Sequence, residues 1–279
     1  MIDLHMHSSA SDGTDSPEIL LRNVQAKGIN IFALTDHDTI TGALKMSEIV
    51  PEGMKFIRGI EFSCITRNKR KCHILGLNYD PDNISFITAL KAGEDLRHEK
   101  FYKRIEILRD KFNITFTDEE IKQLLNIPSV GKPHLGNLIV AKGRAKTRAE
   151  AIETYIDMCK TGNDKIDAET AINAINISGG VSIWAHPLGG EREPELPEDK
   201  FTETLTELMS YGLKGLECYY SKYEYAKCER LEAAAKNRGL YVSGGSDYHG
   251  TNKSIPLGKL NAENIAVPDS RLTILEGVN

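Results

Sequence analysis

Nine histidine, aspartate and glutamate residues stand at the ends of predicted strands or in the loops that follow them, and side chains of these types bind divalent metal ions. They are His5, His7, Asp12, His37, Glu61, His73, His186, Asp247 and His249. Imidazole and carboxylate donors without thiolate suit Mn²⁺, Fe²⁺ or Zn²⁺. One ion takes roughly four donors, so the pattern predicts two or three ions that share a bridging carboxylate. Such a cluster binds a hydroxide between its metals and holds phosphoryl oxygens, which makes hydrolysis of a phosphate ester the leading reaction class.

Each of these residues also has an interpretation that involves no metal. His5 and His7 lie two apart, which on a strand points both imidazoles to one face, but an ordinary strand surface explains the pair equally well. Asp36 and Asp38 would cap the helix that follows them, and for Asp36 we favour this interpretation. Taken alone, Glu61 is better explained as a solvent-facing residue at a strand end. His73 could pack in the sheet, His186 could lie in a turn, and Asp247 and His249 could be polar loop residues. The metal site is favoured because random placement would scatter these residues over helix surfaces.

The segments that carry these residues alternate between strand and helix patterns. Strands are predicted at the N-terminus and at residues 29–35, 55–60, 72–77, 180–185, 213–218 and 240–243. Helices are predicted at residues 16–27, 39–50, 168–177, 200–210 and 222–237. This alternation indicates βα units and a largely parallel sheet, in which the carboxyl ends of the strands open onto one face. Beyond Gly258 the pattern allows one more strand and a tail.

The alternation stops between residues 83 and 167, where the pattern is helical almost throughout. A long amphipathic stretch covers Ile84–Phe112, and shorter helical patterns follow at residues 117–125 and 147–158. A crossover helix needs far less chain than this. We therefore predict a helical subdomain, 83–167, inserted into a barrel that is formed by residues 1–82 and 168–279.

Composition describes an ordinary globular chain of 279 residues, with 40% hydrophobic and 27% charged residues. The formal charge of −5 shows no global attraction to nucleic acid or to an anionic membrane, although it does not exclude a local basic pocket. We find no apolar run near the ~20 residues of a membrane span and no secretory signal. Five scattered cysteines without C-x-x-C spacing indicate reduced thiols and a cytoplasmic protein. No obligate protein partner is evident.

The order of the motifs resembles that of the PHP (polymerase and histidinol phosphatase) family across essentially the whole barrel part. The matching stretches are residues 3–7 (Asp-Leu-His-Met-His), 11–13, 35–38 (Thr-Asp-His-Asp), 59–61, His73 before Leu75-Gly76, 185–187 (Ala-His-Pro) and 246–249 (Ser-Asp-Tyr-His). The resemblance implies an α/β fold, a distorted (β/α)₇ barrel, with a trinuclear Mn, Fe or Zn site. It implies one metal on His5, His7, Glu61 and Asp247, a second on Glu61, His73 and His186, and a third on Asp12, His37 and His249. No ligand position is substituted, which argues against an inactive relative.

The insert carries a further element, residues 131–134 (Gly-Lys-Pro-His), which resembles the Gly-Arg-Pro-His element of family members with a helical insert. Those members resemble 3′,5′-nucleoside bisphosphate phosphatases and exonucleases that trim short RNA from its 5′ end. The resemblance implies that Lys132 and His134 reach the substrate phosphate. Lys132 stands where the family element has Arg, and its ammonium group is a point charge, whereas a guanidinium binds phosphate with two hydrogen bonds. The alternative is a simple helix start, with Pro in the first turn of a helix over residues 135–141. Basic residues on the long helical stretch are better explained as a solvated face than as a polyanion site: Lys100, Lys103, Arg104 and Lys111.

The sequence thus predicts a metal-dependent phosphoesterase for a small phosphorylated substrate, either a 3′,5′-nucleoside bisphosphate or the 5′ end of a short RNA. Asp247 and His249 are expected to act at the metals, and Lys132 and His134 to clamp the phosphate from a lid-like insert. The acid that protonates the leaving group is either His134 or a metal-bound water. Two alternatives stay open: a phosphatase of histidinol phosphate or another small monoester, and a non-catalytic metal- or nucleotide-binding module.

Overall fold

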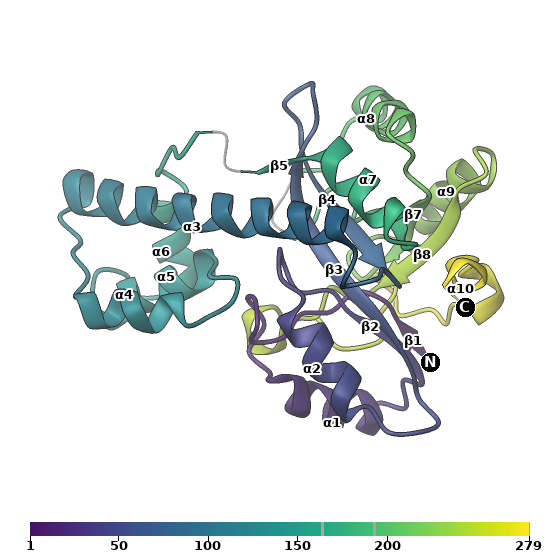
Figure 1. Cartoon of the computed structure of the whole chain (residues 1–279), viewed down its shortest axis with the longest axis horizontal. Coiled ribbons are helices and arrows are strands. Elements are labelled where there is room, and N and C mark those ends of the chain that lie inside the picture. The colour runs from purple at the N-terminus through teal and green to yellow at the C-terminus, as the bar shows by residue number, and fades with distance from the viewer. Residues whose placement is uncertain (163–164, 192–193, 279) are drawn as a thin grey trace.

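A computed structural model describes residues 1–162, 165–191 and 194–278 of the chain. Its centre is a curved sheet whose main path runs β1-β2-β3-β4-β6-β7-β8, with β5 paired to β3. The strands are β1 (Ile2–Asp3), β2 (Ile31–Leu34), β3 (Lys55–Ile65), β4 (Lys71–Leu77), β5 (Ile166–Asp167), β6 (Val181–Trp184), β7 (Gly215–Tyr220) and β8 (Tyr241–Gly245). The two ends of the sheet meet, because Leu4 N donates a hydrogen bond to Gly244 O at 3.2 Å and Met6 bridges Tyr248 in parallel. The sheet is therefore a nearly closed barrel, which confirms the predicted fold (Figure 1).

Helices cover the outside of the barrel at the positions that the sequence predicted (Figure 1). They are α1 (Pro17–Ala26), α2 (Thr41–Ile49), α7 (Ala168–Ile177), α8 (Glu198–Ser210) and α9 (Tyr225–Lys236). The described residues beyond Gly258 hold only a 3₁₀ turn (Asp269–Arg271) and a short helix, α10 (Ile274–Gly277), and not the additional strand that the sequence allowed. None of the helices in the described part of the chain combines the length and the apolar character that crossing a membrane requires.

Strand β4 departs from the strand–helix alternation, because it runs antiparallel to both of its neighbours. Only five residues separate β3 from β4, which is enough for a hairpin but too few for the crossover that a parallel pair needs. The antiparallel direction places the beginning of β4 beside the carboxyl ends of the parallel strands. His73, near that beginning, therefore reaches the same mouth as residues that end parallel strands. Strand β3 also continues to Ile65, so Glu61 lies within a strand and not at its end.

The segment between β4 and β5 is helical, as predicted, and extends away from the barrel (Figure 1). Its elements are α3 (Ile84–Phe112), α4 (Asp118–Leu125), α5 (Lys132–Ala141), α6 (Arg148–Ala151) and a π-helical turn, η1 (Ile152–Ile156). The long helix α3 belongs to two hydrophobic cores: Phe86 packs in the core of the barrel, whereas Phe101 and Leu108 pack with α4 and α5. The second core supports a division of the chain into a barrel and an insert at 83–167. Because α3 contributes to both cores, the exact division stays a prediction.

Candidate metal centre

The structure brings the nine predicted metal ligands into one cluster. Seven of them form three overlapping groups whose donor atoms lie within 4.8 Å of one another: His7, Asp12, His37 and His249; His5, His7 and Glu61; and His37, Glu61 and His73. The other two join the same cluster, since His186 Nε2 lies 3.1 Å from Glu61 Oε1 and Asp247 Oδ1 lies 3.4 Å from His7 Nε2. Segments that are more than two hundred residues apart in the sequence therefore supply a single site.

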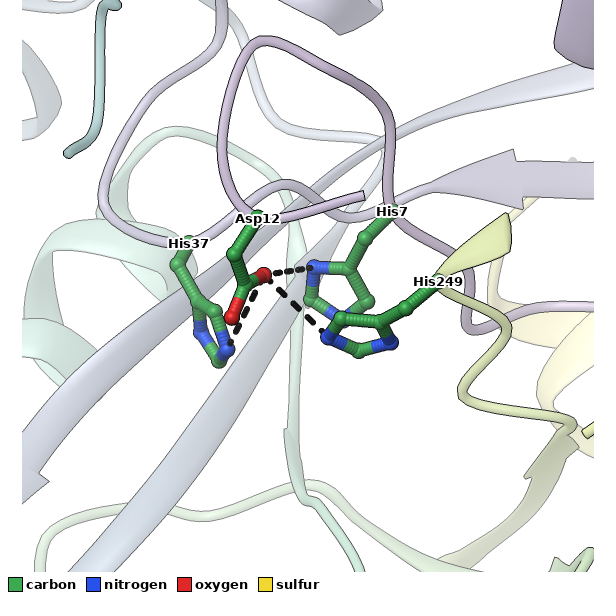
Figure 2. A group of neighbouring side chains, drawn as sticks. All are labelled: His7, Asp12, His37 and His249. Carbon is green, nitrogen blue, oxygen red and sulfur yellow. Dashed lines mark ion pairs between the residues drawn. The ribbon is translucent and has the colours of Figure 1, made fainter. Parts of the chain in front are cut away.

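The carboxylate of Asp12 is the meeting point of one part of the cluster. Its Oδ1 lies 3.1 Å from His249 Nε2 and 3.9 Å from both His7 Nδ1 and His37 Nε2. Figure 2 shows the three imidazoles, which come from three different segments, pointing toward this oxygen. A carboxylate and three imidazoles are a donor set that suits a divalent transition metal.

The carboxylate of Glu61 is the meeting point of the other part. Its Oε2 lies 3.1 Å from His37 Nδ1 and 3.2 Å from the Nε2 atoms of His5 and His7. Its Oε1 lies 2.9 Å from His73 Nδ1 and 3.1 Å from His186 Nε2. A single carboxylate with imidazoles on both oxygens matches the bridging carboxylate that the sequence predicts.

Buried polar atoms without hydrogen bonds show that the residues fit metal ions. Among the described residues, six buried donor atoms of the cluster have no hydrogen-bond partner: His5 Nε2, His7 Nε2, Asp12 Oδ1, His37 Nδ1, Glu61 Oε2 and His249 Nε2. Buried polar groups are nearly always hydrogen-bonded, because leaving one unsatisfied costs about 1–3 kcal/mol. Six such atoms converging on one place are explained when cations occupy the space between them.

The electrostatics of the cluster favour cations. Burial raises the pKa of Glu61, but the imidazoles of His37 and His5 outweigh burial and hold that pKa well below its usual range. Burial lowers the pKa of His37 well below its usual value, so this ring is neutral and able to ligate. Burial also acts to lower the pKa of His7, yet Asp247 and Glu61 raise it to about 9. A divalent ion would replace the proton that His7 otherwise carries, because a ligating imidazole must be deprotonated.

Glu217, on β7, supports the cluster from behind, and sequence reasoning missed it. Its Oε1 accepts a hydrogen bond from His5 Nδ1 at 2.9 Å, and its Oε2 accepts one from the backbone N of His186 at 2.6 Å. The bond to Nδ1 leaves His5 Nε2 free to face the cluster, which is how a carboxylate fixes the tautomer of a ligating histidine. The available signal was a lone acid inside an apolar, fully buried strand.

Asp36 does not cap the helix that follows it, so the favoured interpretation of this residue was wrong. Helix α2 begins after Ile40 without any side-chain cap. Asp36 instead accepts hydrogen bonds from the backbone N of Ser8 at 2.8 Å, from Ser8 Oγ at 2.7 Å and from Ser11 Oγ at 2.6 Å. These bonds hold the loop between His7 and Asp12, and they are a stronger set of partners than a single helix start would supply.

Two arginines of the insert connect it to loops that carry predicted ligands. Arg97 Nε, on α3, donates to Asp38 Oδ2 at 3.0 Å, and a second bond runs from Nη2 of the same guanidinium. Asp38, which directly follows His37, is not a helix cap either, because α2 begins after Ile40 without a side-chain cap and Asp38 accepts its hydrogen bonds from Arg97 and from Ser63 N. Arg148, on α6, donates to both the side chain and the backbone carbonyl of Asn252, whose Nδ2 donates to the backbone O of Asp12 at 2.6 Å.

The glycines of β8 are needed for close packing and not for flexibility. A Cβ at Gly245 would lie 2.2 Å from His5 Cβ and 2.5 Å from His5 N, so only glycine lets β8 approach the segment that follows β1. Asp247 follows with a φ of 59° and donates its backbone N–H to His5 O at 2.8 Å. Its Oδ2 accepts hydrogen bonds from Tyr220 OH at 3.0 Å and from Lys253 Nζ at 2.7 Å, which leaves Oδ1 toward the imidazoles.

The residues predicted to bind phosphate lie at a helix start beside the cluster. Helix α5 begins at Lys132, with Pro133 in its first turn, so the helix-start interpretation is confirmed. A Cβ at Gly131 would lie 3.6 Å from Asp12 Cβ, which places this segment next to a predicted metal ligand. Gly131 N donates to His134 Nδ1 at 2.9 Å, whereas Lys132 Nζ is paired with Asp157 at 2.5 Å. Contact of Lys132 and His134 with a phosphate stays a prediction.

A cleft of ≈ 1290 Å³ opens between the barrel mouth and the insert. His37, His73 and His186 line its barrel side, and Gly131 and Lys132 line its insert side. Of the described residues that line it, eleven are Lys or Arg and five are Asp or Glu. The cleft is therefore positive although the whole chain has a formal charge of −5, as suits an anionic substrate.

A nearly closed α/β barrel with histidine, aspartate and glutamate side chains gathered at its mouth defines a metal-dependent hydrolase. The chain belongs to the PHP domain family, whose model matches residues 3–171. A 5′-3′ exoribonuclease of Haemophilus influenzae is 31% identical and aligns over 98% of this chain and 97% of its own length. A 3′,5′-nucleoside bisphosphate phosphatase of Chromobacterium violaceum is 26% identical and aligns over 89% and 87%, respectively.

The fold is shared with solved structures as well. A candidate metal-dependent phosphoesterase from Bifidobacterium adolescentis superimposes with a TM-score of 0.82 at 27% identity, and covers 100% of this chain and 96% of its own. The predicted family, fold and class of enzyme, a metal-dependent phosphoesterase, are thereby confirmed. The cluster is able to hold metals; their number and identity stay predictions.

Proposed function

We propose that the chain hydrolyses a phosphate ester of a nucleotide-type substrate, either a 3′,5′-nucleoside bisphosphate or the 5′ end of a short RNA. The observation that carries this proposal is the convergence of six buried, unbonded donor atoms at one end of a positive cleft. The names of the two relatives support the nucleotide class of the substrate. Five free, buried cysteines support a cytoplasmic location.

The nine predicted ligands would hold two or three ions of Mn, Fe or Zn. We assign one to His5, His7, Glu61 and Asp247, a second to Glu61, His73 and His186, and a third to Asp12, His37 and His249. The position of Glu61, with imidazoles on both carboxylate oxygens, supports its place in two of these sets. Bound there, such ions supply Lewis acidity, which activates water and neutralises charge on the phosphoryl group.

The side chains of the insert would bind and orient the substrate. Lys132 would exchange its pairing with Asp157 for a phosphate oxygen, at little cost because both side chains are nearly half exposed. Burial lowers the pKa of His134, so the ring is neutral at pH 7. Its Nδ1 accepts the hydrogen bond from Gly131, so the proton resides on Nε2. Nε2–H is thus a donor for a phosphate oxygen or for the leaving group.

Substitution of Asp247 tests the proposal. We expect Asp247→Asn to lose bound metal and to abolish hydrolysis, because the neutral amide removes a carboxylate ligand of the cluster. The control is Asp269→Asn, at an exposed position of the 3₁₀ turn Asp269–Arg271, and it should keep both the bound metal and the hydrolytic activity. Metal content measured by elemental analysis and turnover of adenosine 3′,5′-bisphosphate, short 5′-phosphorylated RNA and histidinol phosphate are the readouts. Full turnover by Asp247→Asn with full metal content would rule out the assigned role.

The same substrate panel separates the alternatives. Faster cleavage of histidinol phosphate than of either nucleotide substrate would favour a phosphatase of small monoesters. Binding of metal without cleavage of any phosphate ester would favour a non-catalytic module. The nucleotide proposal requires that a nucleotide substrate be turned over fastest.

A further inference from the structure

The positive cleft continues from the metal cluster to the β3–β4 hairpin. Three consecutive cations there, Lys69, Arg70 and Lys71, line the cleft. Lys71 and His73 lie two residues apart on β4, so their side chains share one face and are about 7 Å apart along the strand. Positive charge therefore extends stepwise from a predicted metal ligand toward the tip of the hairpin.

Contacts outside the cleft fix the hairpin in place. Arg67 N donates to Glu207 at 2.7 Å, Arg67 Nη2 pairs with Glu169 at 2.6 Å, and Asn68 Nδ2 donates to Glu207 at 3.0 Å. Both acids belong to barrel helices, α8 and α7, that pack beside the hairpin. Arg67 and Asn68 thus bind the acids of α7 and α8, whereas residues 69–71 line the cleft.

A second segment adds positive charge to the cleft. Lys160 and Lys165, from the segment between η1 and β5, line the same cleft. Asp157, an acid of that segment that also lines the cleft, is paired with Lys132 at 2.5 Å. Five cations from two segments therefore line the cleft beside the predicted ligand His73, and Lys69 and Arg70 lie further from His73 along the hairpin than Lys71 does.

The size and lining of the cleft indicate what occupies this end. Its ≈ 1290 Å³ exceeds the roughly 300–1,000 Å³ of sites for small molecules, so a mononucleotide would leave the hairpin end empty. Among the described lining residues, Trp184 is the only Phe, Tyr or Trp side chain, and it is 3% exposed. The described lining therefore offers no exposed Phe, Tyr or Trp side chain on which a base could stack, whereas it has many Lys and Arg side chains that could bind a phosphate backbone.

We propose that the hairpin end of the cleft is a distal subsite for the phosphodiester backbone of a single-stranded oligonucleotide whose terminal phosphate lies at the metal cluster. This inference rests on the proposed function and adds to it the residues that select long substrates. Binding through the backbone alone is independent of base sequence and weakens with salt. Each phosphate contact on a single strand contributes about −0.7 to the slope of log K against log salt concentration.

The test compares a hairpin variant, Lys69→Asn/Arg70→Gln/Lys71→Gln, with a control variant of equal charge, Arg22→Gln/Lys27→Gln/Lys122→Gln. Asn suits position 69 because its φ is 60°. The control residues are exposed and lie outside the cleft. Turnover is measured on adenosine 3′,5′-bisphosphate and on 5′-phosphorylated oligoribonucleotides of about two to twelve nucleotides. Binding of labelled oligoribonucleotides to protein in excess chelator is measured by fluorescence anisotropy, with polyglutamate as competitor.

We expect the hairpin variant to lower kcat/KM for the longest oligonucleotide, relative to that for the bisphosphate, by about tenfold or more, and to make the salt slope less negative by about 2. The control variant should change neither quantity. Equal effects of the two variants, loss of both substrates alike, or displacement of RNA by polyglutamate at equal charge concentration would each overturn the subsite. Because binding is measured without turnover, absence of phosphoesterase activity would refute the proposed function and leave the subsite separately testable.

Discussion

Replacement of Glu217 by Gln should weaken metal binding while the barrel stays folded. The side chain is fully buried and uses both oxygens, one for His5 Nδ1 at 2.9 Å and one for the backbone N of His186 at 2.6 Å. Gln has the same shape but only one acceptor oxygen. If its amide N–H₂ faces His5, the imidazole must carry its proton on Nε2, which is the atom that faces Glu61 and the candidate metal centre. If the N–H₂ faces His186, two donors oppose each other.

Either orientation removes one hydrogen bond to a charged acceptor, which is worth about 1.5–3 kcal/mol. Since 1.4 kcal/mol is a factor of ten in an equilibrium constant, the metal dissociation constant should rise about tenfold to a hundredfold. The same range is typical when a carboxylate behind a ligating histidine is changed.

Competition against a chromophoric chelator measures the affinity for Mn²⁺ or Zn²⁺, and circular dichroism reports whether the variant is folded. Glu232→Gln is the matched control: Glu232 is 4% exposed and accepts a hydrogen bond from Tyr219 OH at 2.5 Å, but it lies on α9 outside the cluster. It should cost stability without changing metal affinity. Metal binding by Glu217→Gln as tight as that of the unmodified chain, or an equal loss of affinity in both variants, would refute the role assigned to Glu217.

Two further predictions concern the insert. Arg97→Met leaves Asp38 buried without its cation, so the free energy of unfolding in urea should fall by about 3–5 kcal/mol, and Asp38→Asn in the same chain should restore part of the loss; a double variant no more stable than Arg97→Met would contradict this account. Lys132→Ala should change stability by less than about 1 kcal/mol, because its pair with Asp157 is nearly half exposed, yet raise KM for the phosphorylated substrate several-fold. An unchanged KM would show that Lys132 does not contact the phosphate.

Local sequence patterns were sufficient to predict the cluster because its members follow strands or lie near strand ends. His73 was recognised although its strand runs antiparallel, because a hairpin reversal brings the beginning of β4 to the same mouth. Glu61 lies within β3, so its apparent place at a strand end was an accident of where the apolar run stopped. The prediction of the cluster therefore depended on the residue types and on the end of the sheet where they lie. It did not depend on the exact strand boundaries.

The supporting residues were missed because their partners are distant in sequence. Asp36 bonds to Ser8 and Ser11, which precede it by 28 and 25 residues, so the local pattern showed only a polar residue before a helix. Glu217 is separated from His5 by 212 residues. No local periodicity reports such a pairing. A lone acid within a buried apolar strand is nevertheless a warning, because an unpaired charge there would cost several kcal/mol.

The insert is connected to the candidate metal centre, and its role as a lid over the substrate stays a prediction. Arg97 reaches Asp38, beside His37, and Arg148 reaches Asp12 through Asn252. Both connections end next to members of one group, Asp12 with its three imidazoles, although one of these imidazoles, His37, also contacts Glu61. The opposite group around Glu61 and His73 is held by the hydrogen bonds of β3 and β4. The position of the insert and the affinity of the Asp12 group for metal should therefore be coupled, since whatever displaces either arginine also releases a loop that carries a predicted ligand.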